Sequence, residues 1–416
     1  MTNHSHTSCI DLAIIGAGAA GVFTAIIAKE QNPRLSIALF EAGDQALSKV
    51  RISGGGRCNV THHEFNPSLM AKGYPRGKKE LRALFNTFQP KNMIEWLNKN
   101  GVKTITEEDG RMFPASQSSQ TIIDLFLSRL SSYKVPLHLN TPIKSVFLSH
   151  DVYVIHPKDK KPLLAKNVLI ATGGSPAGFK LAKNCGHTII PPVPSLFTFK
   201  INDPRLQDLP GISFPNAEIS LKVNQKKYVE TGPVLITHWG LSGPALIKLS
   251  AWAARDLAQT SYQAELRLNL FPGKNEEAIR KSLSEQSLLQ PQKNVGNGIP
   301  EGIPKRFWLQ LLSLLAIPQT KLLSQLSKKN INQLSAQLCS EPYSVTGRGI
   351  FKQEFVTAGG VSLKEVHLKK MESKKSPHLF FAGEVLDMDG ITGGFNFQSA
   401  WTTGYIVAHS IANKKK

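Results

Sequence analysis

Hydrophobic runs separated by short polar turns predict strands and helices in a definite order. Asp11 to Ile15 predicts a short buried strand, Val22 to Glu30 a helix, and Ser36 to Phe40 a second strand. Two later apolar runs favour further strands of the same sheet: Val168 to Gly174 ends in a glycine turn, and the strand in Leu379 to Val385 ends in glycine and an acid. Strands that alternate with helices in this way are typical of a parallel, Rossmann-like α/β sheet.

The middle of the chain follows a different pattern, which begins at the proline-rich stretch 191–194. Short alternating segments from Ser195 to about Leu270 predict a small β-domain, and segments with helical spacing from Asn275 to Ser340 predict a helical one. We therefore expect the first part of a nucleotide-binding domain over 1–192, an inserted β-domain over 193–272, an inserted helical domain over 273–345, and a return to the nucleotide-binding domain over 346–416.

The turn after the first strand has the glycine spacing of a dinucleotide-binding motif. Gly16 permits a tight turn, Gly18 lets the backbone approach phosphates, and Gly21 lets the following helix pack on the strand. Glu41 follows the second strand about 20 residues later, where a carboxylate binds an adenosine ribose. The alternative for the uncharged run Leu12 to Ala28 is a membrane span, but a bilayer takes about 20 apolar residues without a glycine turn.

Two other glycine-rich segments favour a flavin as the dinucleotide's reactive end. Lys49 to His63 places three consecutive glycines beside Ser53 and Arg57, a combination that suits phosphate or the pyrimidine edge of a flavin; its alternative is a plain surface turn. Phe380 to Trp401 has the character of a loop that closes over the flavin. Because no second complete glycine motif is present, we expect NAD(P)H to visit the flavin only transiently.

Composition adds a positive charge and few cysteines. Lys and Arg number 50 against 30 Asp and Glu, for a formal net charge of +20, which favours a polyanionic partner, nucleic acid before an acidic membrane surface. The alternative is solubility alone. The cysteines (Cys9, Cys58, Cys185 and Cys339) form no CxxC pair, and no signal peptide precedes the first strand, so we expect a cytoplasmic protein with reduced thiols.

Five segments in this order resemble one known family. GAGAAG, SGGGRCNVT, THWGLSGPALIKLS, TAGGVSLKEV and FAGEVLDMDGITGGFNFQSAW are similar to the BaiN/RdsA (YhiN-like) family of NAD(P)/FAD-dependent oxidoreductases. The resemblance implies a Rossmann-like FAD-binding domain of the two-dinucleotide-binding flavoprotein type, interrupted by an inserted small β-barrel-like domain and a helical domain. It also implies non-covalent FAD.

The resemblance assigns FAD contacts position by position along the chain. It implies Gly16, Gly18, Ala19, Ala20 and Gly21 at the pyrophosphate, Glu41 and Ala42 at the ribose, Lys49, Ser53, Gly54, Gly55, Arg57 and Asn59 along the cofactor, Ile143 at the adenine, Ala171, Thr172 and Gly173 against the dinucleotide, Gly383 and Glu384 at the pyrophosphate and ribityl chain, and Asp389, Gly393, Gly394, Phe395 and Asn396 around the flavin. A helix from Phe397 would then aim its amides at the flavin N1/O2 edge.

The reaction that the resemblance implies is reduction of an activated C=C bond. Among the possible substrates, uridine in ribosomal RNA best explains the positive net charge, because a basic surface would bind the RNA backbone. The alternative functions are a small-molecule ene reductase or amine oxidase, and a flavin-bearing RNA-binding protein without turnover. Reduction of uracil needs a general acid, for which we name Cys58 and His238; their alternatives are inert packing and a structural turn histidine. His62 and His63 lack a third ligand, so we expect no metal site. The oligomeric state is left open.

Overall fold

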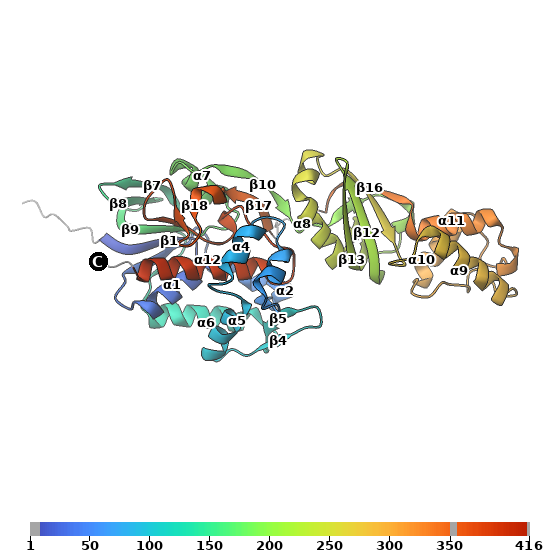
Figure 1. Cartoon of the computed structure of the whole chain (residues 1–416), viewed down its shortest axis with the longest axis horizontal. Coiled ribbons are helices and arrows are strands. Elements are labelled where there is room, and N and C mark those ends of the chain that lie inside the picture. The colour runs from blue at the N-terminus through green and yellow to red at the C-terminus, as the bar shows by residue number, and fades with distance from the viewer. Residues whose placement is uncertain (1–8, 350–355, 414–416) are drawn as a thin grey trace, which may run out of the picture. The chain divides into compact units, whose positions relative to one another are not determined.

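The computed structural model describes residues 9–349 and 356–413. The chain divides into two compact units. Unit 1 consists of Met1–Pro192 and Val356–Lys416, and unit 2 of Val193–Phe355. Unit 1 is therefore built from both ends of the chain, which are the blue-to-green and red parts of the ribbon in Figure 1. None of the helices in the described ranges combines the length and apolarity that a membrane-crossing segment needs.

Unit 1 is organised around a nine-stranded sheet whose central strands are parallel and buried. Strand β1 pairs in parallel with β2 and β9, and all four residues of β2 are buried, as expected for a strand covered on both faces. A meander of β7 and β8 branches from β9. The sheet contains, in spatial order, β18 (Val366–His367), β19 (Glu372–Ser373), β20 (Leu379–Phe381), β9 (Leu163–Ile170), β1 (Cys9–Ile15), β2 (Ile37–Phe40) and β6 (Leu137–His138), with β7 (Ile143–Ser149) and β8 (Val152–Pro157) off this path.

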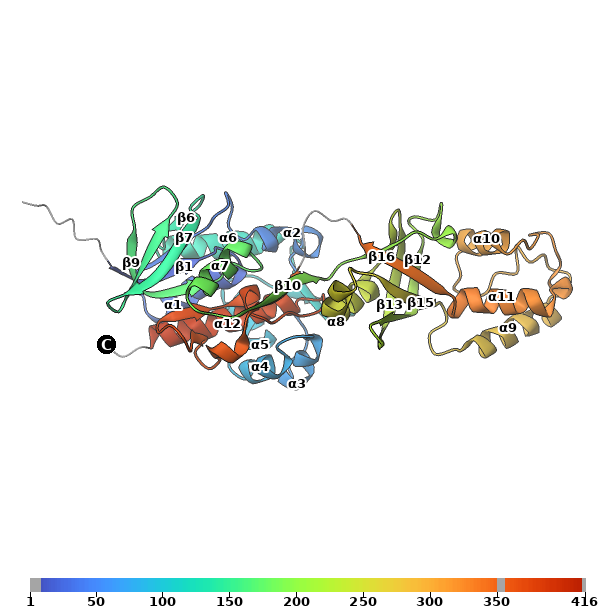
Figure 2. The ribbon, with the colours of Figure 1, turned by 90° about the horizontal axis from the view of Figure 1, so that it is seen from above.

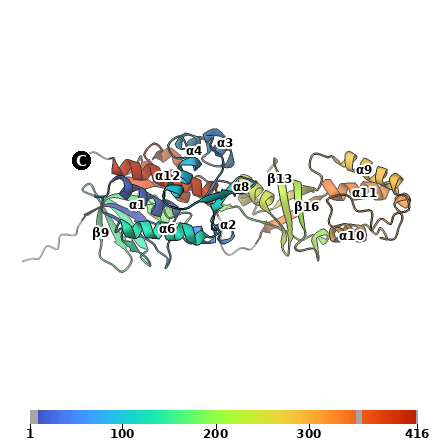
Figure 3. The same cartoon turned by 90° about the horizontal axis from the view of Figure 1, so that it is seen from below.

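Two helices from opposite ends of the chain, α1 (Ala19–Gln31) and α12 (Phe395–Ala412), pack side by side in unit 1 (Figure 2). Between these helices and α6, the rings of Phe23, Phe126 and Trp401 make edge contacts with centroid distances of 5.4 Å for Phe23–Trp401 and 5.5 Å for Phe126–Trp401. These helices lie together against the sheet in Figure 3. The other helices of unit 1 are α2 (Ser48–Gly56), α3 (Pro67–Met70), α4 (Lys78–Leu84), α5 (Pro90–Lys99), α6 (Ser119–Ser132) and α7 (Pro176–Asn184).

Two small sheets complete unit 1. The first joins β3 (Thr61–His62), β5 (Arg111–Pro114) and β4 (Thr104–Thr106), and the second pairs β10 (Ile189–Ser195) with β17 (Val356–Val361).

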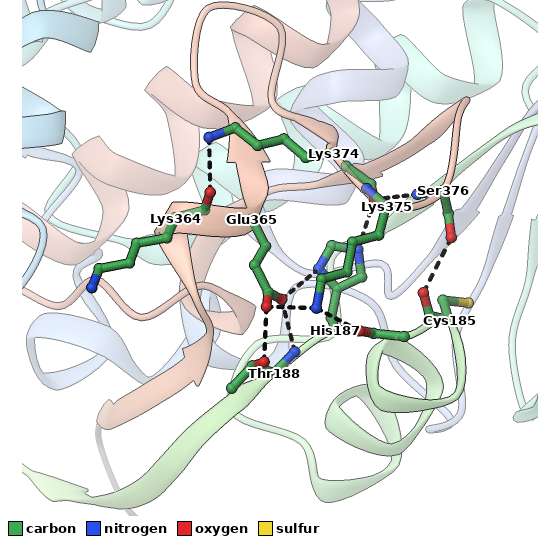
Figure 4. Close-up of polar contacts among 10 residues, drawn as sticks. Cys185, His187, Thr188, Lys364, Glu365, Lys374, Lys375 and Ser376 are labelled. Carbon is green, nitrogen blue, oxygen red and sulfur yellow. Dashed lines mark hydrogen bonds and ion pairs between the residues drawn. The ribbon is translucent and has the colours of Figure 1, made fainter.

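Through hydrogen bonds and an ion pair, Glu365 links the segment before β10 to the segment around β18 and β19 (Figure 4). Its carboxylate accepts hydrogen bonds from the amide and hydroxyl of Thr188 at 2.8 Å each and pairs with Lys375 Nζ at 2.6 Å. Desolvation raises the pKa of Glu365, but the hydrogen bonds from Lys375 and Thr188 outweigh it and bring the pKa to about 2.

In its described part, residues 193–349, unit 2 combines a closed six-stranded barrel with four helices. The barrel and the helices share one hydrophobic core, in which Phe214 of β12 meets Phe307 of α10 at a centroid distance of 5.1 Å. The barrel order is β11 (Phe199–Ile201), β14 (Gly240–Ser242), β13 (Lys226–Thr237), β12 (Ser213–Val223), β15 (Ala264–Asn269) and β16 (Pro342–Arg348), and the helices are α8 (Pro244–Gln259), α9 (Glu276–Leu289), α10 (Lys305–Leu314) and α11 (Lys328–Cys339).

Candidate functional site

Four parallel strands of unit 1 end at one edge of the sheet, and a predicted site residue follows each of them. Gly16 follows β1, Glu41 follows β2, Ala171 follows β9, and Gly383 lies just beyond β20. The register places the last residues of these strands beside one another. Ligands of open α/β sheets bind at the carboxyl ends of the strands, so this edge is the candidate cofactor site.

The turn between β1 and α1 has one open glycine between two closely packed ones. A Cβ on Gly16 would lie 2.5 Å from the carbonyl oxygen of Ala171, and one on Gly21 would lie 2.1 Å from the carbonyl oxygen of Gly16. A Cβ on Gly18, the N-cap of α1, would meet nothing within 4 Å. Ala19 and Ala20 form the first turn of α1, which contains no acidic residue. The turn therefore leaves open space at a helix N-terminus, which suits an anion such as pyrophosphate.

Helix α1 begins earlier than the sequence predicted. The sequence predicted a helix from Val22, whereas α1 begins at Ala19, because Gly18 already caps it and the Ala-Ala-Gly stretch forms its first turn.

Glu41 and its neighbours shape the end of β2. One carboxylate oxygen of Glu41 accepts the amide of Ala17 and the other accepts the amide of Gly43, both at 2.9 Å. Ala42 between them is exposed. Ile143 is buried at the start of β7. The carboxylate is thus held beside the glycine turn, where a ribose would reach it.

Thr172, which follows β9, has a side-chain hydroxyl that makes no hydrogen bond in the described residues. Its Oγ1 is buried and finds no hydrogen-bond partner among the residues that the structure describes. Gly173 follows in a left-handed conformation with φ of 61°. A shielded hydroxyl without a partner is costly, but this one faces Gly178 of α7, where a Cβ would collide with it. The open space at Gly18 is therefore the observation that fits a bound dinucleotide.

Lys49 and Glu384, from opposite ends of the chain, meet at this edge. Lys49 Nζ lies 2.6 Å from Glu384 Oε2, and Glu384 Oε1 accepts the amide of Thr357 at 2.8 Å. The amide of Gly383 donates to Thr403 Oγ1 of α12 at 2.9 Å. The structure thus brings two predicted cofactor residues into direct contact.

The triple-glycine segment follows a short helix that the sequence did not predict. It continues α2, which is helical from Ser48 and is broken by non-helical φ/ψ at Ser53, Gly54 and Gly55. Cβ atoms at Gly55 and Gly56 would meet nothing within 4 Å. Gly55 and Gly56 are therefore open, as a ligand-binding segment requires, whereas a Cβ at Gly54 would lie 2.8 Å from the ring of Phe113.

The guanidinium of Arg57 contacts an aromatic ring and a carboxylate of the protein. Its guanidinium lies 4.0 Å from the ring centroid of Phe113, and Nη1 lies 2.7 Å from Glu107 Oε1. Its role at a cofactor remains a prediction.

Cys58 is fully buried, with 0% exposure and a left-handed φ of 62°. Burial raises the pKa of its thiol to about 12, so the thiol stays protonated at neutral pH. A buried thiol without thiolate character is typical of packing, and its catalytic role remains a prediction.

Asp389 is buried at 0% exposure and forms a bidentate ion pair with Arg76. Arg76 Nε donates to Asp389 Oδ1 at 2.6 Å, and Nη2 donates to Oδ2. Because the side chain of Arg76 is only 9% exposed, the two charges depend on each other. No motif marks Arg76, and the sequence did not predict it.

A second set of contacts holds the glycines before α12. Asn59, with its amide oriented to suit its neighbours, accepts from the Gly394 amide and donates to the Thr61 carbonyl, each at 3.0 Å. His62 Nδ1 lies 3.0 Å from the Gly393 carbonyl oxygen. Gly394 is the N-cap of α12, so the helix begins at Phe395 rather than at the predicted Phe397.

The first turn of α12 is fixed by side chains as well. The ring of Phe395 stacks on His62 at a centroid distance of 4.6 Å, and Tyr74 donates its hydroxyl to the Phe395 carbonyl at 2.6 Å. Asn396 bonds the backbone of Gly390 in both directions at 2.9 Å. Tyr74 was missed as a site residue. His62, which the sequence analysis considered only as one of a histidine pair without a third ligand, lies just after the SGGGRCN segment.

His238 belongs to unit 2, where it is exposed in the turn between β13 and β14. The adjacent Trp239 donates its indole N–H to Thr198 Oγ1 at 3.0 Å. The catalytic role of His238 remains a prediction. In the described ranges, no three His, Cys, Asp or Glu side chains gather as a metal site would require.

Comparison with known proteins relates nearly the whole chain to one family model. The model described as HI0933-like protein Rossmann domain matches residues 10–410. A relative from Escherichia coli, "Ribosomal RNA dihydrouridine synthase", is 29% identical over 97% of this chain and 98% of its own. A protein of the same name from Haemophilus influenzae is 28% identical over 96% and 98%. The "3-dehydro-bile acid delta(4,6)-reductase" of Clostridium scindens is 26% identical over 97% and 99%.

Solved structures share the fold at low identity. The 3-ketosteroid delta1-dehydrogenase from Sterolibacterium denitrificans matches with a TM-score of 0.53 and 13% identity, over 98% of this chain and 100% of that one. The open conformation of a flavocytochrome c3 fumarate reductase matches with a TM-score of 0.52 and 16% identity, over 98% and 79%. These likenesses concern the arrangement of elements alone.

Proposed function

Because the chain belongs to the HI0933-like Rossmann family, we propose that it is an NAD(P)H-driven reductase of an activated C=C bond, with uridine in ribosomal RNA as its substrate. Family membership and the fold comparisons confirm the resemblance, the fold class and the enzyme class, an FAD-dependent oxidoreductase, that the sequence predicted. The substrate and the electron donor are the proposed part.

The observation that carries the cofactor site is the alignment of four strand ends around an open glycine turn. Gly18 and the N-terminus of α1 would hold the pyrophosphate, and Glu41 the ribose. The N-terminus of α12 follows Gly394 and has no acidic residue in its first turn, which suits the edge of a flavin that gains negative charge. When bound and reduced by NAD(P)H, FAD would supply the hydride for reduction of a C=C bond.

Support for RNA comes from charge and from relatives. The formal net charge of +20 favours a polyanion, and the two bacterial relatives named for ribosomal RNA dihydrouridine synthesis match over almost the full chain. Action on ribosomal RNA would place the protein in the cytoplasm.

The reduction of uracil also needs a proton at C5, for which we propose His238 or Cys58 as the donor. The burial of Cys58 favours His238, which is exposed. We expect His238→Asn to lower the rate of dihydrouridine formation about 100-fold or more, because general acids contribute about 10²–10⁴-fold. Cys58→Ser is expected to stay within a few-fold of the native rate; the reverse pattern would assign the proton to Cys58.

A second candidate function rests on the bile acid reductase of Clostridium scindens, which matches over 97% of the chain. A small-molecule ene reductase with the same cofactor site would use NAD(P)H but would not need RNA.

Mass-spectrometric mapping of dihydrouridine in ribosomal RNA from cells with and without the gene separates these functions. The proposal expects a defined uridine to lose its modification when the gene is deleted and to regain it with purified protein, FAD and NAD(P)H in vitro. An unchanged profile, with NAD(P)H consumed only when a small enone is added, would favour the ene reductase. Oxidation of amines instead, or binding of FAD and RNA without turnover, would favour the remaining alternatives.

A further inference from the structure

Unit 1 contains a cavity of about 960 Å³ on the side of the sheet where β2 and β6 lie. Its lining comes from β1, from β2 and the turn before it, from β6 and the end of α6, and from the turn between β8 and β9. None of the residues predicted to contact FAD belongs to this lining. The cavity adjoins the cofactor edge, however, because the amide of Thr141 in its lining donates to the Glu41 carbonyl at 2.7 Å.

The described residues that line this cavity include several basic side chains and no acidic ones. The lining includes Lys29, Arg34, Lys134, Lys160 and Lys161, and no Asp or Glu is among its described residues. Arg34, Lys134 and Lys161 are exposed. A hollow with several cations and no acid attracts a ligand that carries several negative charges.

Two of the lysines are already oriented by the protein. Lys160 Nζ donates to Thr141 Oγ1 at 2.8 Å, and Lys29 Nζ donates to the Leu35 carbonyl at 2.9 Å. The neighbouring acid Asp11 accepts from Ser36 but is paired with Lys166 at 2.8 Å, so it does not cancel the charge of the lining.

An aromatic pair lies in the same cavity. The rings of Phe40 and His138 are stacked, with centroids 5.1 Å apart and an interplanar angle of 16°, and Tyr133 also lines the cavity. His138 is exposed, and desolvation together with the nearby Lys160 lowers the pKa of its imidazole. An uncharged ring backed by another ring is a platform on which a nucleobase can stack.

We propose that this cavity binds a single-stranded segment of the RNA substrate, with its phosphates on the exposed cations and a base on the His138 ring. The inference rests on the proposed function and deepens it by naming where the strand is held. Cations combined with aromatic rings are typical of single-strand recognition. An acidic membrane surface fits less well, because none of the exposed large hydrophobic side chains of the described ranges lines the hollow.

A triple variant of the FAD-loaded full-length protein tests the cations. Arg34→Gln, Lys134→Gln and Lys161→Gln together remove the exposed charges of the lining, and Lys78→Gln, Lys91→Gln and Lys180→Gln remove three exposed lysines outside it. Binding of a fluorescent 12-nucleotide single-stranded RNA is measured by anisotropy over a range of salt concentrations. The cavity variant is expected to lose about tenfold in affinity, and its log K against log salt slope should fall by about 2, since each lost phosphate contact removes about 0.7. The control should change less than twofold; equal losses in both variants would overturn the inference.

Photocrosslinking of native protein to RNA that contains 4-thiouridine locates the strand without any substitution. We expect crosslinked peptides that contain Phe40, Tyr133 or His138. Crosslinks confined to other surfaces would overturn the assignment. Complete displacement of the RNA by uridine 5′-monophosphate at an equal nucleotide concentration would also overturn it, because that result describes a site for one small nucleotide.

Failure of this inference is distinguishable from failure of the proposed function. If native protein forms dihydrouridine and binds RNA, but the cavity variant binds RNA equally well, only the cavity assignment falls. If native protein neither binds RNA nor reduces uridine, both fall. The flavin absorbance of each variant is recorded so that loss of FAD is not mistaken for loss of RNA.

Discussion

The two segments that meet at the candidate site are held in place by different means. Near the N-terminus, Gly16 and Gly21 allow backbone atoms to approach where a Cβ would collide. Near the C-terminus, side chains fasten the loop to distant parts of the chain, as Asp389 does with Arg76. The contact of Gly21 with Gly16 is local and can be predicted from the glycine spacing, whereas the approach of Gly16 to Ala171 and an ion pair more than 300 residues apart join distant parts of the chain. The first segment was therefore predictable and the second was predictable only in part.

The largest loss of stability is expected when the buried ion pair between Arg76 and Asp389 is broken. Asp389→Asn removes the buried carboxylate charge that Asp389 offers to the Arg76 guanidinium, and we expect a loss of about 3–5 kcal/mol in unfolding free energy by urea titration. Glu265→Gln is the control, because Glu265 and its partner Arg267 are both exposed, and it should cost about 1 kcal/mol or less. Equal losses would mean that the pair does not anchor the C-terminal loop.

Alanine at two glycines of the N-terminal turn tests the other half of the contrast. Gly21→Ala places a Cβ against the Gly16 carbonyl oxygen and should cost about 1–3 kcal/mol of stability. Gly18→Ala meets nothing within 4 Å and keeps an extended backbone with φ of −82°, so its stability should change by less than about 1 kcal/mol. Its FAD affinity should nevertheless fall about tenfold in a fluorescence titration. Native affinity in Gly18→Ala would show that no phosphate lies there.

Glu365 tests whether side-chain fastening also stabilises the C-terminal half outside the site. Glu365→Gln should lower unfolding free energy by about 1–2 kcal/mol at pH 7, because charge-assisted hydrogen bonds from Thr188 and Lys375 are weakened. The folded pKa, about 2, lies below the ordinary value of 4.5. The stabilisation is therefore complete above pH 4.5 and is lost as the pH falls through 2. Melting temperatures of both proteins between pH 7 and 2 should converge on acidification; a constant difference would contradict the assignment.

The pair between Lys49 and Glu384 gives the smallest expected change in stability. The Lys49 side chain is 52% exposed, so Lys49→Gln should cost less than about 1 kcal/mol. If Lys49 lies along the cofactor, FAD affinity should still drop several-fold. A large loss of stability with unchanged FAD binding would reverse the roles that we assign to this lysine.

The sequence predicted elements whose determinants are local. The strand expected over Asp11 to Ile15 is β1, Cys9–Ile15, and the strand expected over Ser36 to Phe40 is β2, Ile37–Phe40. The helix that precedes the triple glycine, from Ser48, was not predicted, because three glycines indicate conformational freedom but do not show that a helix leads into them.

Site residues outside the motifs could not be predicted for a related reason. Arg76, Tyr74 and His62 reach the site through tertiary contacts with Asp389 and Phe395. Nothing in the residues that flank them along the chain records those contacts. A single sequence therefore shows the glycine turns of the site but not the side chains that hold its C-terminal loop.

Hydrogen exchange with and without FAD is the most direct test of the claim that both ends of the chain form one cofactor site. The account predicts that amides in 14–22 and in 389–398 both become protected when FAD is added to apoprotein, in the same titration and at the same FAD concentration. Protection of the first segment alone, or of neither, would contradict it.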